Sequence, residues 1–285
     1  MPGETMQPPT ESEAHGRVAP SERGESVAPS EILSIKNCSM HFGGLKAVSC
    51  FDFSLKEGEL AGLIGPNGAG KTTVFNLIMG VLSPTSGHIY FQGEKIDGLP
   101  TYRIATTGIG RTFQATRLFK DLTVLDNVRT ACHIHAHSSL LGAVVRSRGF
   151  VEDEARIMNI ALRQLETFGL LHLKDSLASM LPYGLQRRVE IARALAGEPR
   201  LLLLDEPAAG MNPQETDELM KLVRWVRDEF KLTIFLIEHD MRVVMGICER
   251  IAVLDHGVKI AEGNPDEIKR DAKVIEAYLG EDVVC

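Results

Sequence analysis

The distribution of apolar and polar residues divides the chain into short apolar runs separated by helix-like and turn-like segments. Runs that are almost entirely apolar occupy 60–64, 201–204, 233–237 and 251–254. Each run is too short for an amphipathic helix and is bounded by polar residues, so each predicts a buried strand of a parallel sheet. Residues 47–55 alternate apolar and polar positions, which predicts a strand with one buried face.

Other segments predict further strands and a set of helices. A strand begins at Ile32 and Leu33, and residues 86–93, with a glycine near each end, predict a hairpin-like pair of short strands. Helical segments are predicted at 73–79, 152–168, 186–196 and 214–230, with a closing helix that ends near 279. Strands that alternate with helices imply an α/β fold whose parallel sheet carries helices on both faces.

The chain divides into a polar tail and one folded unit. Residues 1–30 are rich in Pro, Glu, Ser and Gly and contain few large apolar side chains, so they predict a disordered tail. Residues 31–285 are predicted to fold as one domain. Segments 31–113 and 197–285 form its core, including an antiparallel β subdomain, and the mainly helical segment 114–196 is inserted between them.

Composition and charge exclude several classes of protein. The chain has 285 residues, a net charge of −7 and a pI near 5.8, which argues against a nucleic-acid binder. Its five cysteines are scattered and contain no CxxC pair, as expected for reduced thiols and not for a disulfide framework or zinc site. No apolar stretch approaches the roughly 20 residues that span a bilayer, and no signal peptide is evident. We therefore expect a soluble intracellular chain.

A glycine-rich segment follows the apolar run 60–64. Residues 65–73 match the P-loop pattern GxxxxGK[ST], with a predicted strand before it and a predicted helix after it, which is the context that this motif requires. Backbone N–H groups of such a loop cradle phosphates, the lysine reaches the β- and γ-phosphates, and the Ser/Thr hydroxyl binds Mg²⁺. The predicted nucleotide-binding residues here are Asn67, Gly68, Gly70, Lys71, Thr72 and Thr73, with Thr72 also a metal ligand.

A second nucleotide signal ends the apolar run 201–204. Asp205 and Glu206 follow it directly, so a buried parallel strand delivers both carboxylates to the crevice at its carboxyl end. With a P-loop upstream, Asp205 is predicted to hold Mg²⁺, usually through water. Glu206 is predicted to orient or deprotonate the attacking water.

Three histidines alternate at 133, 135 and 137. On a strand they would share one face and suggest a metal site. The region is predicted to be helical and no fourth ligand follows at a matching spacing, so we expect no metal centre there.

With these motifs the chain resembles the ATP-binding subunits of ABC transporters over nearly its whole length after residue 30. The resemblance implies a P-loop NTPase core with a mostly parallel sheet, an antiparallel β subdomain and an inserted helical subdomain. It implies that Gln114, in Arg-Thr-Phe-Gln, touches Mg²⁺ or the nucleophilic water and couples the core to the insert. It also implies that His239 contacts the γ-phosphate and that Phe42 stacks on adenine.

Residues 181–188 lie at the position of the family's signature motif, commonly LSGGQ. Gly184 fits the motif, whereas Pro182 and Tyr183 replace a serine and a glycine. The resemblance implies that this loop completes the ATP site of the opposite subunit. Because proline has neither a hydroxyl nor an N–H, we place the phosphate contact on the backbone around Gly184. Asn212 stands where the family commonly has an aspartate.

Within the family, the chain most resembles the ATPases of branched-chain amino-acid importers. The segments that carry this resemblance are 42–48, 110–114, 118–124, 206–213, 237–241 and 277–280. Importers of urea or short amides and the lipopolysaccharide-export ATPase share parts of this set and remain alternatives.

The resemblance implies ATP and Mg²⁺ as cofactors and a membrane assembly as the setting. Its partners would be a second ATPase subunit in a heterodimer or homodimer, two transmembrane permeases and an extracytoplasmic solute-binding protein. The chain would then lie at the cytoplasmic face of the membrane, docked near 117–127. Closure of the ATPase dimer around ATP would move the permeases, and hydrolysis would reopen it.

Three non-transport functions are alternatives to this interpretation. A chromosome or DNA-repair ATPase would need a long heptad insertion between the P-loop and signature segments, and the chain has none. A ribosome-acting protein of this family would normally carry two cassettes, and only one P-loop is present. A nucleotide-binding regulator without turnover remains an alternative, which replacement of Glu206 would distinguish.

Overall fold

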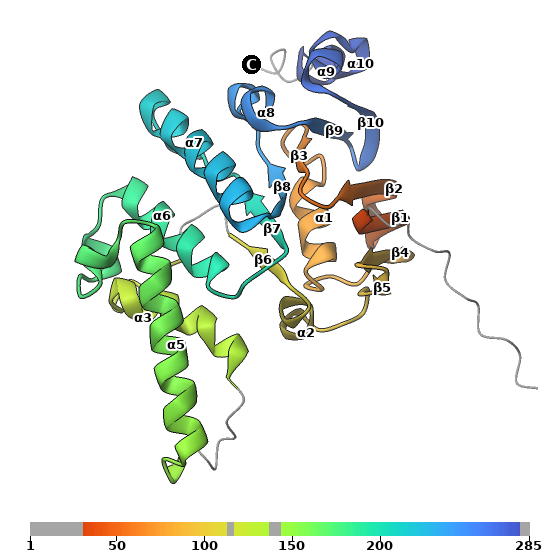
Figure 1. Cartoon of the computed structure of the whole chain (residues 1–285). Helices are drawn as coiled ribbons and strands as arrows, with labels where there is room; N and C mark the ends of the chain where they lie inside the picture. Colours follow the sequence, from red (N-terminus) through yellow and green to blue (C-terminus); the bar gives the residue numbers. More distant parts are fainter. Residues whose placement is uncertain (1–30, 113–116, 137–143, 280–285) are drawn as a thin grey trace, which may run out of the picture.

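The computed structural model describes residues 31–112, 117–136 and 144–279. Two sheets and the helices around them form the larger part of the molecule (Figure 1). The helices between residues 117 and 195 form a lobe on one side of it, which we call the helical lobe. The predicted tail at 1–30 and Gln114 lie outside the described residues.

The strands form an antiparallel sheet and a mainly parallel sheet. The antiparallel sheet has the order β2-β1-β4-β5, and the other has the order β10-β9-β3-β8-β7-β6, with β10 alone antiparallel to its neighbour. The antiparallel strands are β1 (Glu31–Phe42), β2 (Leu45–Lys56), β4 (Ser86–Phe91) and β5 (Glu94–Lys95). The second sheet contains β3 (Leu60–Ile64), β6 (Ile109–Arg111), β7 (Leu201–Asp205), β8 (Thr233–Ile237), β9 (Arg250–Asp255) and β10 (Val258–Gly263). Both the α/β class and the division into a parallel and an antiparallel sheet are confirmed.

Helices cover both faces of the parallel sheet. They are α1 (Lys71–Ile78), α2 (Thr101–Thr106), α3 (Val124–Cys132), α5 (Arg148–Thr167), α6 (Tyr183–Leu195), α7 (Pro213–Phe230), α8 (Met241–Ile247), α9 (Pro265–Arg270) and α10 (Ala272–Leu279). Short 3₁₀ turns lie at His133–His135, Leu171–Leu173 and Ala178–Met180. The turn at His133–His135 follows α3, so the backbone there is helical as expected, and His137 lies outside the described residues.

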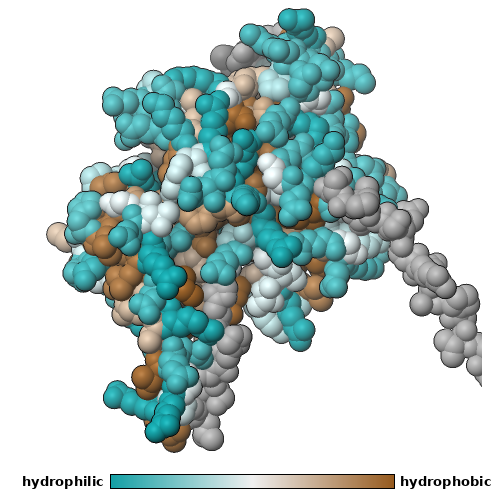
Figure 2. Space-filling view, viewed as in Figure 1, coloured by the Kyte–Doolittle hydropathy of each residue, from teal (hydrophilic) through white to brown (hydrophobic). Residues whose placement is uncertain are grey.

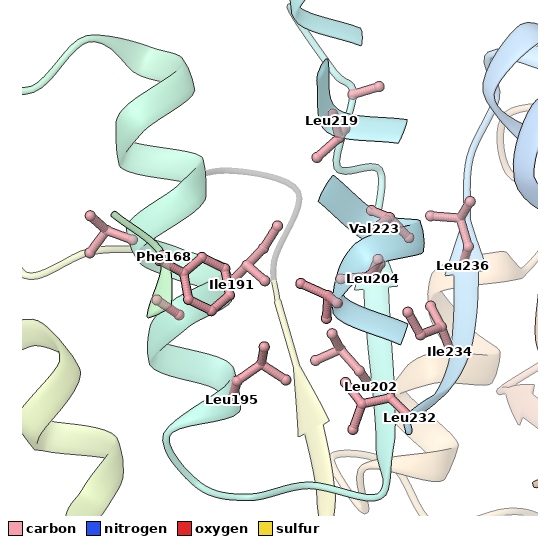
Figure 3. Close-up of a cluster of buried hydrophobic side chains, with 14 of the residues drawn as sticks. Phe168, Ile191, Leu195, Leu202, Leu204, Leu219, Val223, Leu232, Ile234 and Leu236 are labelled. Carbon is pink, nitrogen blue, oxygen red and sulfur yellow. The ribbon is translucent and has the colours of Figure 1, made fainter. Parts of the chain in front are cut away.

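Burial on both faces explains the continuous apolar runs of the central strands. In β7, Leu202 and Leu204 pack into one hydrophobic cluster, together with side chains of α7 and of the helical lobe, including its helix α6 (Figure 3). Leu201 and Leu203 pack into a second cluster on the opposite face, beneath α1 and the antiparallel sheet. A strand with water on neither side has no polar face, which is why the sequence shows no alternation here.

The first cluster also joins the helical lobe to the sheet. Ile191 and Leu195 of α6 contribute to the same cluster as Leu219 and Val223 of α7 and the sheet residue Leu202 (Figure 3). The position of α6 relative to β7 is therefore set by buried apolar contacts, which are worth about 25 cal/mol for each Å² removed from water.

Three sequence predictions at the sheet edges were wrong or missing. Residues 86–93 are not a hairpin of two strands; β4 is one continuous strand, and the hairpin is formed with β5 through Gln92 and Gly93. Both turn residues have positive φ, as a two-residue hairpin turn requires. Strands β6 and β10 were not predicted, because β6 is only three residues long and β10 is a partly exposed edge strand with charged residues.

No helix in the described ranges combines the length and apolar character needed to cross a bilayer.

Candidate nucleotide-binding site

The P-loop follows β3 and is held between two neighbouring chain segments. Gly65 has φ +151°, and a Cβ there would lie 1.9 Å from the carbonyl oxygen of Leu254 in β9. Gly70 has φ +104°, and a Cβ there would lie 2.3 Å from the carbonyl oxygen of Ala47 in β2. Only glycine fits this backbone path, so the loop is fixed by close approach of its neighbours.

Helix α1 begins directly after this loop without a side-chain cap. Its first residue, Lys71, is buried, and Nζ donates hydrogen bonds to the carbonyl oxygens of Gly65 (2.7 Å) and Pro66 (2.9 Å). Thr72 is exposed and Thr73 is half-buried. An uncapped helix N-terminus beside a lysine presents backbone N–H groups and positive charge, a combination suited to binding phosphate.

The P-loop has an exposed part, and the strand pair that borders the loop carries the exposed Phe42. Asn67 and Gly68 are exposed, and Gly68 has the positive φ of +79° that favours glycine. Phe42 ends β1, is exposed, and pairs with Leu45 two residues before the Ala47 that Gly70 approaches. An exposed aromatic ring therefore stands on the strand pair that borders the P-loop.

Asp205 lies buried at the end of β7 in an ion pair that the sequence did not predict. Arg111 at the end of β6 donates from Nη2 to Oδ2 of Asp205 at 2.7 Å and from Nη1 to Oδ1 of Asn76 at 2.8 Å. The Arg111 guanidinium also lies 5.6 Å from the centre of the Phe75 ring. Because β6 and β7 are adjacent parallel strands, both charges arrive at the same edge of the sheet.

Glu206 and His239 come together at the ends of adjacent strands β7 and β8. Nδ1 of His239 lies 3.6 Å from Oε2 of Glu206, with side chains 56 % and 14 % exposed respectively. Glu206 has a positive φ of +45°, and its N–H donates to the carbonyl oxygen of Ile237 at 2.9 Å. The two predicted catalytic residues are thus brought within ion-pairing distance, with the carboxylate sheltered and the imidazole in solvent.

Glu238 is a further polar residue at this site, and its role was not predicted. Its side chain is fully buried, Oε1 accepts from the N–H of Ala208 at 2.8 Å, and Oε2 accepts from the N–H of His239 at 3.2 Å. Burial raises the pKa of the Glu238 carboxyl, and the backbone donors oppose that effect. The only sequence signal was a glutamate directly after a buried strand.

Gly184 lies away from the P-loop within this chain. It sits in the first turn of α6, a helix of the helical lobe, whereas α1 lies beside the sheets (Figure 1). Apart from its chain neighbours and its own helix backbone, no described atom lies within 4 Å of the position that a Cβ would take at Gly184. The first turn of α6 is therefore open to an external partner, and Pro182 at its N-cap offers no side-chain hydrogen bond.

The remaining predicted residues have simple placements. Gln114 lies outside the described residues, between the buried Thr112 and the exposed Arg117. Asn212 caps α7 by accepting from the N–H groups of Gln214 and Glu215 at 3.0 Å, so the asparagine retains the capping ability of an aspartate. Across the part of the chain that the structure describes, no group of three or more His, Cys, Asp or Glu side chains could hold a metal by themselves.

Two family models match the chain. Residues 48–209 match the model described as "ABC transporter". Residues 258–284 match the model described as "Branched-chain amino acid ATP-binding cassette transporter". The first match includes the P-loop, Asp205 and Glu206.

Known proteins match over most of their own length. The high-affinity branched-chain amino acid transport ATP-binding proteins BraF of Pseudomonas aeruginosa and LivG of Escherichia coli are each 45% identical over 250 residues, covering 88% of this chain and 98% of theirs. The lipopolysaccharide export system ATP-binding protein LptB of Escherichia coli is 36% identical over the same coverage.

Solved structures show the same architecture. An ATP-binding cassette of an ABC transporter in its ADP conformation has a TM-score of 0.76 and 32% identity, covering 88% of this chain and 99% of that one. A dimeric post-hydrolysis cassette bound to ADP and Pi has a TM-score of 0.67 and 27% identity, covering 82% of this chain and 98% of that one.

Proposed function

Because the chain belongs to the ABC transporter family, we propose that it is the ATP-hydrolysing subunit of a membrane transporter for branched-chain amino acids. One observation carries the enzymatic part of this proposal. Helix α1, with Lys71 at its uncapped N-terminus, follows β3 of the parallel sheet. In the same sheet β7 ends at Asp205, and Glu206 lies beside His239. That arrangement combines a phosphate cradle with a sheltered carboxylate suited to activating water.

The P-loop is proposed to hold the triphosphate. Lys71 would exchange its hydrogen bonds to the Gly65 and Pro66 carbonyls for contacts with the β- and γ-phosphates. The N–H groups of the loop and of the first turn of α1, from Asn67 to Thr73, would surround the phosphates. Phe42 is proposed to stack on the adenine ring, since its exposed ring borders the same loop.

The oxygen ligands of the site fit Mg²⁺. Thr72 offers a hydroxyl and Asp205 a carboxylate, and Gln114 is proposed as a third oxygen donor; such hard oxygen ligands are those that Mg²⁺ prefers. Arg111 donates a hydrogen bond to Oδ2 of the same Asp205 carboxylate. When bound, Mg²⁺ would neutralise phosphate charge during transfer.

Glu206 and His239 are proposed to carry the hydrolytic step together with Gln114. Glu206 accepts a proton from, or orients, the attacking water, and its position is fixed by the backbone bond to Ile237. His239, which lies 3.6 Å away and is 56 % exposed, is proposed to contact the γ-phosphate.

A second ATPase subunit is proposed to complete the site. Its signature loop would present backbone N–H groups around the residue equivalent to Gly184, as Gly184 does for the partner's nucleotide. We propose a heterodimer with a related subunit, two permeases and an extracytoplasmic binding protein, assembled at the cytoplasmic face of the membrane. The relatives' branched-chain amino-acid transport supports this cargo.

The permeases are proposed to dock on the segment 117–127. Phe119 and Leu122 expose large apolar side chains there. Asn127 is buried behind them; it accepts from the N–H of Phe119 at 2.8 Å and donates to the carbonyls of Phe119 and Thr123. An exposed apolar surface on a rigidly braced loop suits a protein partner.

Replacement of Glu206 by glutamine tests the enzymatic proposal. The variant keeps the side-chain shape and should still bind ATP, while turnover falls by at least about a hundredfold because the base is lost. An unchanged basal rate would favour the alternative of a regulator without turnover. Leucine uptake by the complex reconstituted in vesicles, with lipopolysaccharide release measured in parallel, distinguishes an amino-acid importer from a lipopolysaccharide exporter.

A further inference from the structure

Tyr183 links the loop after Glu206 to the helical lobe by a chain of hydrogen bonds. The Tyr183 hydroxyl donates to the carbonyl oxygen of Ala209 at 3.1 Å. Nη2 of Arg187 donates to the same hydroxyl at 3.3 Å, and the guanidinium lies 5.8 Å from the centre of the Tyr183 ring. Nη1 of Arg187 then donates to Oε2 of Glu190 at 2.6 Å. One hydroxyl therefore acts as both donor and acceptor between the two parts.

At the helical end, the chain of hydrogen bonds continues to Arg117. Oε1 of Glu190 accepts from the N–H of Arg117 at 3.3 Å, and Arg117 lies three residues after Gln114. Nη1 of Arg193 donates to the Arg117 carbonyl oxygen at 2.7 Å. Helix α6 thus holds the Arg117 backbone at both its N–H and its carbonyl.

At the end opposite Arg117, the chain of hydrogen bonds reaches Glu238 and the N–H of His239. The N–H of Ala208, next to Ala209, donates to Glu238, and so does the N–H of His239. The loop after Glu206 is therefore bonded on one side to the residue before His239 and on the other side to Tyr183.

The residues in this chain of hydrogen bonds differ in how deeply their side chains are buried. Arg187 and Glu190 are each 1 % exposed, and a buried ion pair of this kind fixes one geometry more than it adds stability. Tyr183 is 38 % exposed, and its hydroxyl makes the connection to Ala209. The contact at Tyr183 is thus the point at which a small movement would separate the Glu206 loop from α6.

We propose that Tyr183 is a positioning residue for ATP hydrolysis, whose hydroxyl couples the position of the Glu206 loop to that of α6. The inference rests on the proposed function, because α6 carries the Gly184 backbone that is proposed to serve the partner's nucleotide. In a two-subunit site, the same hydroxyl would connect a subunit's own catalytic loop with the phosphate contact that it offers to its partner.

Trp225 provides a reporter for this coupling. It is the chain's one tryptophan and lies on α7, facing a groove of 640 Å³ that α6 lines with Gly184 and Arg187. Its ring meets Phe168 of the helical lobe edge-on, with centroids 5.4 Å apart. Its fluorescence should therefore change when α6 and the helical lobe move relative to α7.

The test compares Tyr183→Phe with Tyr102→Phe in the full-length chain. Tyr102 is 69 % exposed on α2 and serves as the control for removal of a hydroxyl. For Tyr183→Phe we expect kcat to fall about threefold to tenfold, the factor associated with one hydrogen bond, with KM for MgATP changed less than about twofold. The Trp225 fluorescence change on adding MgATP should be lost in Tyr183→Phe and retained in Tyr102→Phe.

Two results would overturn the inference. The first is a kcat and a fluorescence response equal to those of the wild type. The second is a loss of MgATP binding or of thermal stability in proportion to the loss of kcat, which would indicate a purely structural role. Absence of ATP hydrolysis in the wild-type chain at every protein concentration, with and without a second ATPase subunit, would instead contradict the proposed function itself.

Discussion

The P-loop and the first turn of α6 are both glycine-bearing turns at helix N-termini, yet the fold constrains them very differently. At Gly65 and Gly70 an added Cβ would lie 1.9 Å and 2.3 Å from backbone carbonyl oxygens of neighbouring strands. At Gly184 no described atom outside its own helical turn lies within 4 Å of that position. Gly65 and Gly70 are required by the chain's own packing, whereas no neighbouring segment among the described residues requires glycine at 184.

This difference indicates which contacts fix the backbone conformation of each half of the proposed ATP site. The P-loop is built by internal contacts and is complete within one chain. The first turn of α6 is positioned by the apolar cluster and by Tyr183, but its surface faces outward. A glycine that the fold does not need is explained if another molecule must approach it closely.

The largest expected effect concerns the P-loop half alone. Lys71→Ala should lower MgATP turnover by at least about a hundredfold and abolish transport, because the positive charge at the β- and γ-phosphates is lost. Lys269→Ala, at an exposed position on α9, serves as the matched control. Nucleotide binding and turnover measured for both variants check this. Wild-type turnover in Lys71→Ala would contradict the proposal that the P-loop binds the phosphates.

A matched pair of glycine variants tests the comparison itself. Gly65→Ala should destabilise the protein by more than about 4 kcal/mol or prevent folding, because its Cβ collides with the Leu254 carbonyl. Gly184→Ala should change stability by less than about 1 kcal/mol but lower turnover about tenfold or more, because its methyl group obstructs the partner's phosphate. Denaturant unfolding and ATPase assays give both quantities. Equal stability losses in the two variants would show that the halves are built alike.

The buried ion pair beside the P-loop half predicts a smaller loss of stability. Arg111→Ala leaves Asp205 buried without this partner and should cost about 3–5 kcal/mol of unfolding free energy. Arg103→Ala, on the exposed face of α2, should cost less than about 0.5 kcal/mol. Urea unfolding of both variants makes the comparison, and a similar small cost for each would show that Asp205 does not depend on Arg111.

The smallest effect is a pH dependence at Glu238. Burial raises the pKa of Glu238 above its usual 4.5, so the stability from its protonated form is fully present below the unfolded pKa. That contribution is lost as pH rises through the folded pKa. The stability of the wild type relative to Glu238→Gln should therefore decline between acidic and neutral pH; Glu229→Gln, at an exposed position on α7, serves as the control. A relative stability that is constant or rises with pH contradicts this assignment.

Much of the core could be predicted from the sequence because its signals are local. The runs at 201–205 and 233–237 form β7 and β8. They could be predicted because strands buried on both faces consist of nearly uninterrupted apolar residues. The P-loop could be predicted for the same reason, because its glycines, lysine and flanking elements are contiguous.

Contacts between distant segments could not be predicted in this way. The partner of Asp205, Arg111, lies 94 residues away, and the pair is formed only because β6 and β7 are neighbours in the sheet. Glu238 and Tyr183 form hydrogen bonds with backbone atoms of Ala208 and Ala209, and such contacts leave no side-chain signature in the sequence. Edge strand β10 was missed because its half-exposed residues lack a strong apolar pattern.

The dependence of ATP turnover on protein concentration tests most directly whether this chain holds only half of an ATP site. MgATP binding and hydrolysis would be measured over the same dilution series of the full-length wild-type chain, with and without a second ATPase subunit. The account predicts a constant binding affinity but a turnover per chain that falls on dilution and rises when a second subunit is supplied. A turnover per chain that stays the same at every dilution, with no response to a second subunit, would contradict it.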